Sequence, residues 1–431
     1  MTSGDGDFPQ RSDDYALLDD IDLGPFLGHE QSLAEPGADA ERTGLTAPTL
    51  LLQLRDLLLM PAFVPTFGRA LRGADPAFRA MFPRDPEPIV RHFVEAMAHI
   101  LVVSEESRGD AQKVEPAILF ARHLGADHRK LRLGPAAFET FYDALHRTLE
   151  HLAGSAWSTK LAQTLRSAYE IITAAMVEGA SEKDGPASVG ATVVEVHRPI
   201  RDVAIVRLIA DQMLGYHPGQ YLSVQTPYAP AVWRPLSPSN PSNPARQIEF
   251  HVRAIEGGLF SSPLVRSAAA GDRWVVARPL GRLEINRNDD PRRDALVIVG
   301  STGVAPALCL INDMLRFPDN PRVHLFYGAR YPGELYALPT LVDLARTAPW
   351  LTIQPVAEEA EDPWWLTAAP DLPRTLHRLQ TGRLVDVVTR YGNWSDRQVL
   401  ISGSPQMIDG TLAKLLEVGT PLESISYDRP R

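Results

Sequence analysis

The chain has 431 residues, with 53 acidic against 43 basic side chains and a formal net charge of −10 at pH 7. This acidic balance argues against non-specific binding to nucleic acid or to an anionic membrane, because both need a basic surface. The length predicts two to four domains. The single cysteine, Cys309, lies in an apolar run and is expected to be a small buried hydrophobe. One thiol excludes an intramolecular disulfide and a cysteine-ligated iron–sulfur cluster.

Residues 1–45 are acidic and Gly-rich with few hydrophobic side chains, which predicts a disordered tail. Its most apolar stretch, YALLDDIDLGPFL, could act as a short docking motif, although an undocked tail is the simpler interpretation. The start of the chain lacks the pattern of a signal peptide, and no apolar stretch has the length of a transmembrane helix. We therefore expect a cytoplasmic protein.

Residues 46–180 predict one compact all-α domain. Apolar side chains recur three and four residues apart in six segments that Pro and Gly separate. These segments include LLQLRDLLL, IVRHFVEAMAHILVV and PAAFETFYDALHRTLEHLA. Residues 181–190, within the small and polar stretch GASEKDGPASVG, are expected to form a linker.

The remaining chain predicts two further domains. Short β-rich runs between turn residues, among them ATVVEVHRP, VAIVRLIA and QIEFHVRAI, predict an antiparallel β-barrel or sandwich over 191–290. From 291 to 431 strands alternate with helices, beginning with ALVIVG and APALCLINDMLR. This alternation predicts an α/β domain whose parallel sheet is covered by helices on both faces.

A Gly-rich turn opens the α/β domain. In LVIVGSTGVAPALCLINDML an apolar strand runs into Gly300, Thr302 and Gly303 and then into a helix. Free amide groups and the positive end of the helix dipole would face a phosphate there, and the glycines would let the backbone approach it. A tight strand-to-helix turn without a ligand would use the same glycines. Its place at the start of an α/β domain favours nucleotide binding.

Two loops of the predicted barrel carry polar groups suited to a phosphate. In WRPLSPSNPS, Arg234 and Ser237 would offer a cation and a hydroxyl. In EGGLFSSPL, a glycine turn precedes the hydroxyls and amides of Ser261 and Ser262. Taken alone, either loop is also consistent with an ordinary surface loop.

The order of these motifs resembles that of the ferredoxin-NADP reductase-like family. HPGQYLSV, RPLS, FHVR with EGGLFSS, RPLG, VIVGSTGVAPAL and LISGSPQMI follow one another over about 190–431. Proteins of that family have an FAD-binding β-barrel followed by a nicotinamide-binding α/β domain. The resemblance implies that hydride passes from nicotinamide to FAD where these domains meet, and that the flavin passes electrons onward singly.

The resemblance also implies roles for individual residues. Arg234 and the candidate catalytic residue Ser237 would contact the flavin phosphate and isoalloxazine, and the turn 258–262 would hold the pyrophosphate. The family has an aromatic residue where this chain has Leu236, so Tyr221 or Tyr427 could stack on the flavin instead. The full set of implied cofactor-binding residues is Tyr221, Arg234, Pro235, Leu236, Ser237, His251, Val252, Arg253, Gly257, Gly258, Ser261, Ser262, Gly300, Thr302, Gly303, Gly403, Ser404 and Pro405.

The expected electron donor is NADH. Arg330 follows the strand LFYGA at a place where a basic side chain can meet the 2′-phosphate of NADPH, so use of NADPH stays open.

A helical domain in front of a reductase pair resembles the order of the flavohemoglobins. FGRALRGADPAFRAMFP is similar to the globin stretch that ends in an aromatic residue at the haem edge, here Phe82. ARHLGADHRKLRLGPAAF is similar to the stretch with the proximal histidine, which makes His128 the implied iron ligand of a haem b and His123 its competitor.

The residues expected around bound oxygen depart from that family. Gly68 stands at the place of the distal Tyr, Ile89 or else His92 at the place of the distal Gln, and Phe138 at the place of a proximal Tyr. A pocket without hydroxyl or amide donors holds polarised oxygen less well, which puts nitric oxide dioxygenation in doubt. A sixth iron ligand at His92 is a weaker hypothesis.

Together these features predict an NAD(P)H-dependent FAD oxidoreductase of flavohemoglobin type. Electrons would pass through FAD to a haem in the helical domain and on to a small-molecule acceptor, namely oxygen, nitric oxide or an organic substrate. One alternative is a haem-less flavin reductase that serves an external redox partner. Another is a redox-controlled globin sensor. The sequence leaves the oligomeric state open.

Overall fold

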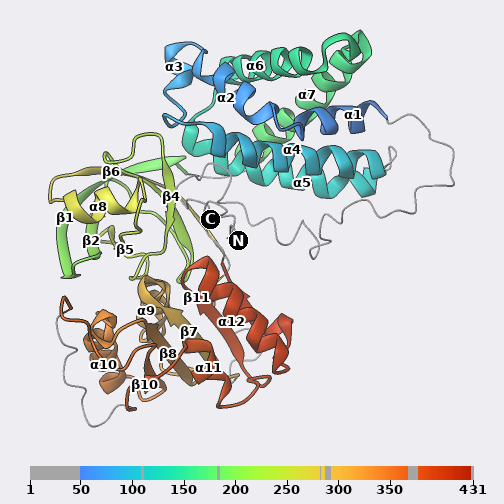
Figure 1. Cartoon of the computed structure of the whole chain (residues 1–431). Helices are drawn as coiled ribbons and strands as arrows, with labels where there is room; N and C mark the ends of the chain where they lie inside the picture. Colours follow the sequence, from blue (N-terminus) through green and yellow to red (C-terminus); the bar gives the residue numbers. More distant parts are fainter. Residues whose placement is uncertain are drawn as a thin grey trace, which may run out of the picture. The chain divides into compact units, whose positions relative to one another are not determined.

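The structure of the protein is a computed structural model, which describes residues 49–107, 111–181, 185–281, 283–286, 293–366 and 377–428. The predicted tail over 1–45 lies outside the described residues. The chain divides into two compact units between Ser188 and Val189. We call them the helical unit and, after the resemblance that the sequence of residues 190–431 implies, the reductase unit (Figure 1).

The helical unit contains the predicted segments and one additional short helix. Asp75 accepts hydrogen bonds from the amides of Ala77 and Phe78 and starts a separate turn, α3, where we predicted a connection between helices. The α-helices are α1 (Leu50–Leu58), α2 (Phe63–Arg72), α3 (Pro76–Arg79), α4 (Glu87–Ser107), α5 (Ala111–His128), α6 (Pro135–Ala153) and α7 (Thr159–Ser181). Two 3-10 turns, η1 (Arg129–Leu131) and η2 (Gly154–Ala156), follow α5 and α6.

Aromatic rings fill the centre of the helical unit. Phe67 on α2, Phe93 on α4 and Phe141 on α6 lie in mutual contact, with ring centroids 5.1–5.7 Å apart. Helices α5 and α7 approach so closely that a Cβ atom on Gly125 would lie 1.9 Å from the carbonyl oxygen of Met176. Glycine is therefore required at this crossing, since a Cβ cannot approach a backbone atom so closely.

The first part of the reductase unit, which we call the barrel subdomain, is a six-stranded sheet in the order β4-β3-β6-β1-β2-β5. The pairs β1–β2, β2–β5, β3–β4 and β3–β6 are antiparallel. A further antiparallel bridge joins Pro238, just after β4, to Phe250 on β5, so the two edges of the sheet meet as in a barrel. The elements are β1 (Ser188–Ile200), β2 (Val203–Ala210), β3 (Tyr221–Gln225), β4 (Trp233–Leu236), β5 (Gln247–Arg253), α8 (Ser261–Ser267) and β6 (Arg273–Leu280).

The predicted linker over 181–190 differs from the structure at both ends. Helix α7 continues to Ser181, and β1 already begins at Ser188. The strand starts early because Val189 is buried in the barrel core and the carbonyl of Gly190 accepts a hydrogen bond from the amide of Asp211.

The second part, which we call the sheet subdomain, confirms the predicted α/β arrangement. Its six strands pair in parallel in the order β10-β9-β8-β7-β11-β12. Alternate residues of β7 pack against α9 and α10 on one face and against α11 and α12 on the other. The elements are β7 (Ala295–Gly300), η3 (Ser301–Gly303), α9 (Val304–Met314), β8 (Val323–Ala329), η4 (Pro332–Glu334), α10 (Leu338–Thr347), β9 (Leu351–Ala357), β10 (Gln380–Thr381), α11 (Leu384–Thr389), β11 (Gln398–Ser402), α12 (Pro405–Glu417), η5 (Leu422–Ser424) and β12 (Ile425–Tyr427).

Cys309 is buried, as predicted. It lies on α9 of the sheet subdomain, yet it packs into the hydrophobic core of the barrel subdomain. Burial raises the pKa of its thiol to about 12. The two subdomains thus share part of one core.

Across the described part of the chain, no single helix combines the length and the apolar character needed to cross a bilayer. Helices α1 and α2 meet that test only as a pair, bent by 78°.

Candidate functional site

The two predicted nucleotide-binding turns meet at the point where the strand order of the sheet subdomain reverses. From β7 the chain continues outward to β8 and β9, whereas β11 and β12 lie on the other side of β7. The turns after β7 and β11 therefore flank the carboxyl ends of adjacent strands. In open α/β sheets, dinucleotides bind in a crevice at this position.

Glycines bring these two turns into contact. A Cβ atom on Gly303 would lie 2.4 Å from the carbonyl oxygen of Ser402, and one on Gly403 would lie 2.8 Å from Sδ of Met407. At Gly300 a Cβ atom would meet Met407 at an ordinary distance of 3.6 Å. Gly303 is thus needed for the close approach of the turns and Gly300 is not, whereas the contact at Gly403 is with a flexible side chain on the helix that follows it.

The polar side chains of the two turns differ in whether their hydroxyls remain available to a ligand. The hydroxyl of Ser404 caps α12 by accepting a hydrogen bond from the amide of Met407, and Pro405 takes the first helical position. The hydroxyl of Thr302 makes no hydrogen bond with the described residues. Of these two side chains, Thr302 is therefore the one available to a nucleotide.

The predicted flavin residues on β4 lie along one strand. Arg234 is buried on β4, where it pairs with Val224 of β3. Pro235 and Leu236 follow it on the strand, and Ser237, which is half-buried, makes no hydrogen bond with the described residues.

Tyr221 is a weaker candidate for stacking on a flavin than the sequence suggested. Its side chain is buried, and its ring edge lies against Gly281, where a Cβ atom would come within 2.9 Å. Tyr427 lies at the end of β12 and is half-buried. A flavin would need exposed aromatic surface, which the packing of Tyr221 does not provide.

The turn that leads into α8 is closed by its own side chains. Gly257 adopts a φ of +77°, and no atom would lie within 4 Å of a Cβ added there. The hydroxyl of Ser261 accepts a hydrogen bond from the amide of Ile255, and the hydroxyl of Ser262 donates one to the carbonyl of Ile255. Because the hydroxyls already hold the turn, only the backbone amides of these serines remain for the predicted contact with a pyrophosphate.

Strand β5 presents a row of polar side chains that the sequence analysis recognised only in part. Glu249, His251 and Arg253 alternate along the strand and so share one face of it. His251 Nδ1 lies 2.9 Å from the hydroxyl of Tyr336 in the sheet subdomain, whereas Val252 packs into the barrel core. His251 and Arg253 thus link the two subdomains.

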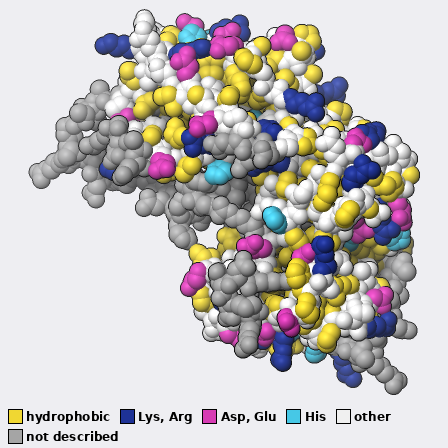
Figure 2. Space-filling view, turned by 180° about the vertical axis from the view of Figure 1, so that it is seen from behind, with side chains coloured by type: hydrophobic (Ala, Val, Ile, Leu, Met, Phe, Trp, Pro, Cys, Tyr) yellow, Lys and Arg dark blue, Asp and Glu magenta, His cyan; other side chains and the backbone are white. Residues whose placement is uncertain are grey.

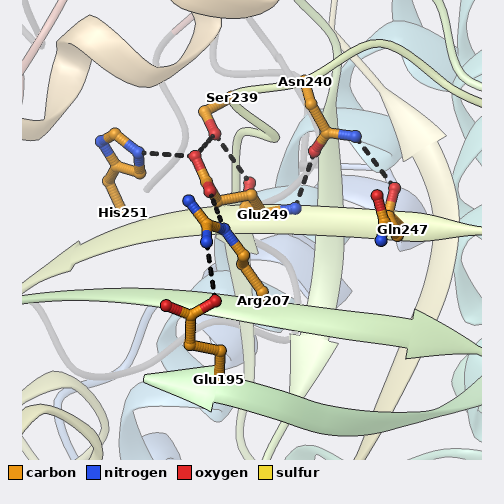
Figure 3. Close-up of polar contacts among 7 residues, drawn as sticks. All are labelled: Glu195, Arg207, Ser239, Asn240, Gln247, Glu249 and His251. Atoms are coloured by element: carbon orange, nitrogen blue, oxygen red, sulfur yellow. Dashed lines mark hydrogen bonds and ion pairs between the residues drawn. The ribbon is translucent and has the colours of Figure 1, made fainter. Parts of the chain in front are cut away.

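Glu249 is the centre of a polar network on the barrel (Figure 3). Its carboxylate accepts hydrogen bonds from Ser239 Oγ at 2.5 Å and Arg207 Nε at 2.6 Å, and lies 3.2 Å from His251 Nε2. Burial raises the pKa of this carboxyl, but hydrogen bonds from His251, Ser239 and Arg207 outweigh burial and bring the pKa to about 2. The charged carboxylate holds His251 in place for its contact with Tyr336.

Arg253 joins the barrel to the turns that follow β7 and β8 of the sheet subdomain. Its Nη1 donates to Ser301 Oγ at 3.0 Å, and its Nη2 donates to Glu334 Oε1 at 2.5 Å. Its Nε lies 2.8 Å from Asp202 in the turn between β1 and β2. The sequence analysis did not identify Glu334 and Tyr336. The sequence feature that points to them is indirect: it is the alternation of polar residues in QIEFHVR, the strand that contacts both.

At the position that the globin resemblance implies for the iron ligand, the helical unit contains a histidine suited to bind a metal. His128 ends α5, and its Nδ1 lies 2.8 Å from the carbonyl oxygen of Leu124. Because a carbonyl only accepts, Nδ1 carries the proton and the lone pair of Nε2 remains for a metal. Burial lowers the pKa of His128, which favours the neutral ring, whereas the competing His123 is exposed.

The positions that the resemblance implies for the distal side differ from this arrangement. Gly68 is buried, and a Cβ atom there would meet Glu87 Cγ at 3.2 Å and Pro86 Cγ at 3.8 Å. Ile89 is buried in the helical unit, and His92 forms an ion pair with Glu95 at 3.7 Å. Phe82 packs against the core with its ring 5.2 Å from Phe78. Among the residues that the globin resemblance implies, His128 thus fits the role of an iron ligand, whereas the side chains of Gly68 and Ile89 contain no hydrogen-bond donor.

Phe138 is half-buried, and its carbonyl accepts a hydrogen bond from Tyr169 at 2.8 Å. Within the described ranges, no three His, Cys, Asp or Glu side chains gather as a protein-only metal site would require.

Comparison with known proteins identifies the barrel. Residues 191–285 match the oxidoreductase FAD-binding domain family. The chain is 25% identical over 246 residues to the electron transfer component XylA of the xylene/toluene monooxygenase of Pseudomonas putida, which is 57% of this chain and 66% of that protein. It is 28% identical over 239 residues to the ferredoxin–NAD(P)(+) reductase CarAd of Metapseudomonas resinovorans, which is 55% of this chain and 68% of that protein. The chain thus spans about two thirds of the length of these relatives.

One solved structure is similar over both units. The flavohemoglobin from Malassezia yamatoensis, crystallised with bound FAD and haem, superimposes with a TM-score of 0.65 over 88% of this chain and 96% of that one. The sequence identity is 15%, so the likeness concerns the fold alone.

Taken with the geometry, these findings define the class of the second unit. It is an FAD-binding oxidoreductase module of the ferredoxin reductase type. The sequence prediction of this module is confirmed.

Proposed function

We propose that the chain is an NAD(P)H-dependent FAD reductase that passes electrons to a separate redox protein. The observation that carries the proposal is the junction of two glycine turns at the reversal point of the sheet, beside a barrel of the FAD-binding family. The relatives are electron transfer or reductase components, and one is the reductase component of propane 2-monooxygenase from Rhodococcus jostii. A single cysteine excludes an iron–sulfur cluster held by cysteines of this chain, so electrons need another acceptor.

Each part of the site has a role in this proposal. FAD, when bound, accepts hydride from the nicotinamide and releases electrons singly. Arg234 and Ser237 would hold the flavin, and the amides of the turn 257–262 would hold its pyrophosphate. The turns with Gly300, Thr302 and Gly303 and with Gly403 would bind the nicotinamide nucleotide. The Glu249–His251–Tyr336 contacts keep the subdomains aligned, which fixes the two ligands relative to each other.

A second function is favoured by one observation, the free Nε2 lone pair of the half-buried His128. In it the helical unit binds haem b and is the electron acceptor, as in a flavohemoglobin, with oxygen or nitric oxide as terminal acceptor. The absence of a distal donor at Gly68 and Ile89 weighs against efficient nitric oxide dioxygenation. In a variant of this function, the helical unit is a sensor, and the reductase unit only keeps its haem reduced.

One experiment distinguishes the two functions. The purified protein is supplied with FAD and haem, and its absorption spectrum is recorded before and after anaerobic addition of NADH or NADPH. Flavin bleaching without a Soret band, together with rapid reduction of ferricyanide, supports the reductase. A Soret band that shifts as the flavin bleaches, and that His128→Ala removes while His123→Ala keeps it, supports the haem protein. No flavin reduction by either nucleotide would contradict both.

A further inference from the structure

The guanidinium of Arg253 lies at the proposed dinucleotide crevice, although the residue belongs to the barrel. Its two contacts in the sheet subdomain are Ser301, in the turn after β7, and Glu334, in the turn after β8. Both strands end at the edge of the sheet where a dinucleotide is expected. A fixed cation from the barrel therefore stands beside the expected position of the pyrophosphate.

Carboxylates already hold this cation. Glu334 lies 2.5 Å and Asp202 lies 2.8 Å from nitrogens of Arg253, so two negative charges face one positive charge. Glu334 is itself held in place, because its other oxygen accepts hydrogen bonds from the amides of Arg330 and Tyr331 at 3.1 and 3.3 Å. Its side chain is only 9% exposed, compared with 31% for Arg253.

The guanidinium keeps capacity for another anion. Of its five N–H groups, three are directed at Ser301, Glu334 and Asp202. One N–H on each terminal nitrogen remains without a partner among the described residues. A guanidinium can donate two N–H groups to two oxygens of a phosphate.

We propose that Glu334 is an affinity-determining residue for the dinucleotide, because it competes with the pyrophosphate for Arg253. The negative charge of Glu334 weakens the attraction between Arg253 and an incoming pyrophosphate, so that the oxidised nucleotide can leave after hydride transfer. The inference rests on the proposed function, since it takes the crevice to be the nucleotide site. Glu334 also joins the barrel to the sheet, and the experiment separates that structural role from the electrostatic one.

The test measures binding of ADP-ribose, which contains the pyrophosphate but undergoes no hydride transfer, to the FAD-loaded protein by calorimetry. We expect Glu334→Gln to lower Kd about tenfold, equivalent to ~1.4 kcal/mol. Arg253→Gln should raise Kd, and adding Glu334→Gln to Arg253→Gln should bring no tightening. Asp343→Asn, which removes a carboxylate paired with Arg346 at 2.8 Å on α10, is the matched control and should leave Kd unchanged.

Equal or weaker binding by Glu334→Gln with an unchanged flavin spectrum and melting temperature would overturn the inference. The inference would also be overturned if Glu334→Gln lowered the Kd for ADP-ribose equally in the protein with Arg253 and in the Arg253→Gln variant. Should Glu334→Gln fail to fold, Arg253→Lys keeps the charge but lacks the fork, and unchanged ADP-ribose affinity in that variant would also overturn it. Failure of the unaltered protein to bind ADP-ribose would contradict the proposed function as well, whereas binding without an effect of Glu334 contradicts the inference alone.

Discussion

The helical unit and the reductase unit differ in how many of the side chains that their chemistry would need are present at the candidate sites. The reductase unit combines its fold with close-packed glycine turns and ordered polar contacts at the proposed dinucleotide crevice. The helical unit has an aromatic core and, at His128, a ring nitrogen placed to bind a metal, but Gly68 and Ile89 stand where the flavohemoglobins have donors to oxygen. The comparison teaches that packing preserves a fold while a few side chains decide its function.

The largest expected effect concerns the crevice. Gly303→Ala should raise the Kd for ADP-ribose by at least about a hundredfold, because its Cβ would lie 2.4 Å from the carbonyl oxygen of Ser402 and force the turns apart. Gly410→Ala on α12 is the matched control, since no atom lies within 4 Å of its added Cβ. Calorimetry measures both, and normal binding by Gly303→Ala would show that the turns do not form the site.

A corresponding substitution tests the other unit. Gly125→Ala should destabilise the helical unit by about 3 kcal/mol or more, because its Cβ would lie 1.9 Å from the carbonyl oxygen of Met176 on α7. Thermal melting followed by circular dichroism should show early loss of helix, while NADH-driven ferricyanide reduction persists. Gly134→Ala, with open space around the added Cβ, is the control. Simultaneous loss of both signals would mean that the units depend on each other for stability.

The polar network on β5 should make the reductase unit sensitive to acid. The pKa of Glu249 is about 2, below its ordinary value of 4.5, so the carboxylate stabilises the fold above pH 4.5 and this stabilisation is lost as the pH falls toward 2. Glu249→Gln should cost about 2 kcal/mol at pH 7 and flatten the fall in melting temperature between pH 5 and 3. Ser395→Ala, in an exposed loop of the sheet subdomain, serves as the control. An unchanged acid profile would contradict the role of Glu249.

The smallest expected effect concerns the choice of nucleotide. The guanidinium of the exposed Arg330 lies 5.2 Å from the ring centre of Tyr331. Arg330→Ala should raise the KM for NADPH about fivefold relative to that for NADH, because a 2′-phosphate would lose its cation. Steady-state kinetics with both nucleotides measure the ratio, and an unchanged ratio would exclude contact between Arg330 and the 2′-phosphate.

Features that depend on neighbouring residues were predictable from the sequence. Periodicity and turn residues predicted the helical unit, the barrel and the parallel sheet, and strand-turn-helix order predicted the turns at Gly300–Gly303 and Gly403. Contacts between distant segments were not predictable, since no local pattern encodes them. Arg253 and Glu334 are 81 positions apart, and the need for glycine at Gly125 arises only because α7 crosses there.

The burial of Cys309 affects how the protein resists oxidation. Thiol oxidation proceeds through the thiolate and needs access to solvent, and this side chain, fully buried with a pKa of about 12, provides neither. The one sulfhydryl of the chain would therefore be shielded from peroxide formed during the proposed electron transfer. Oxidative inactivation of the protein should begin elsewhere, at exposed methionines such as Met213.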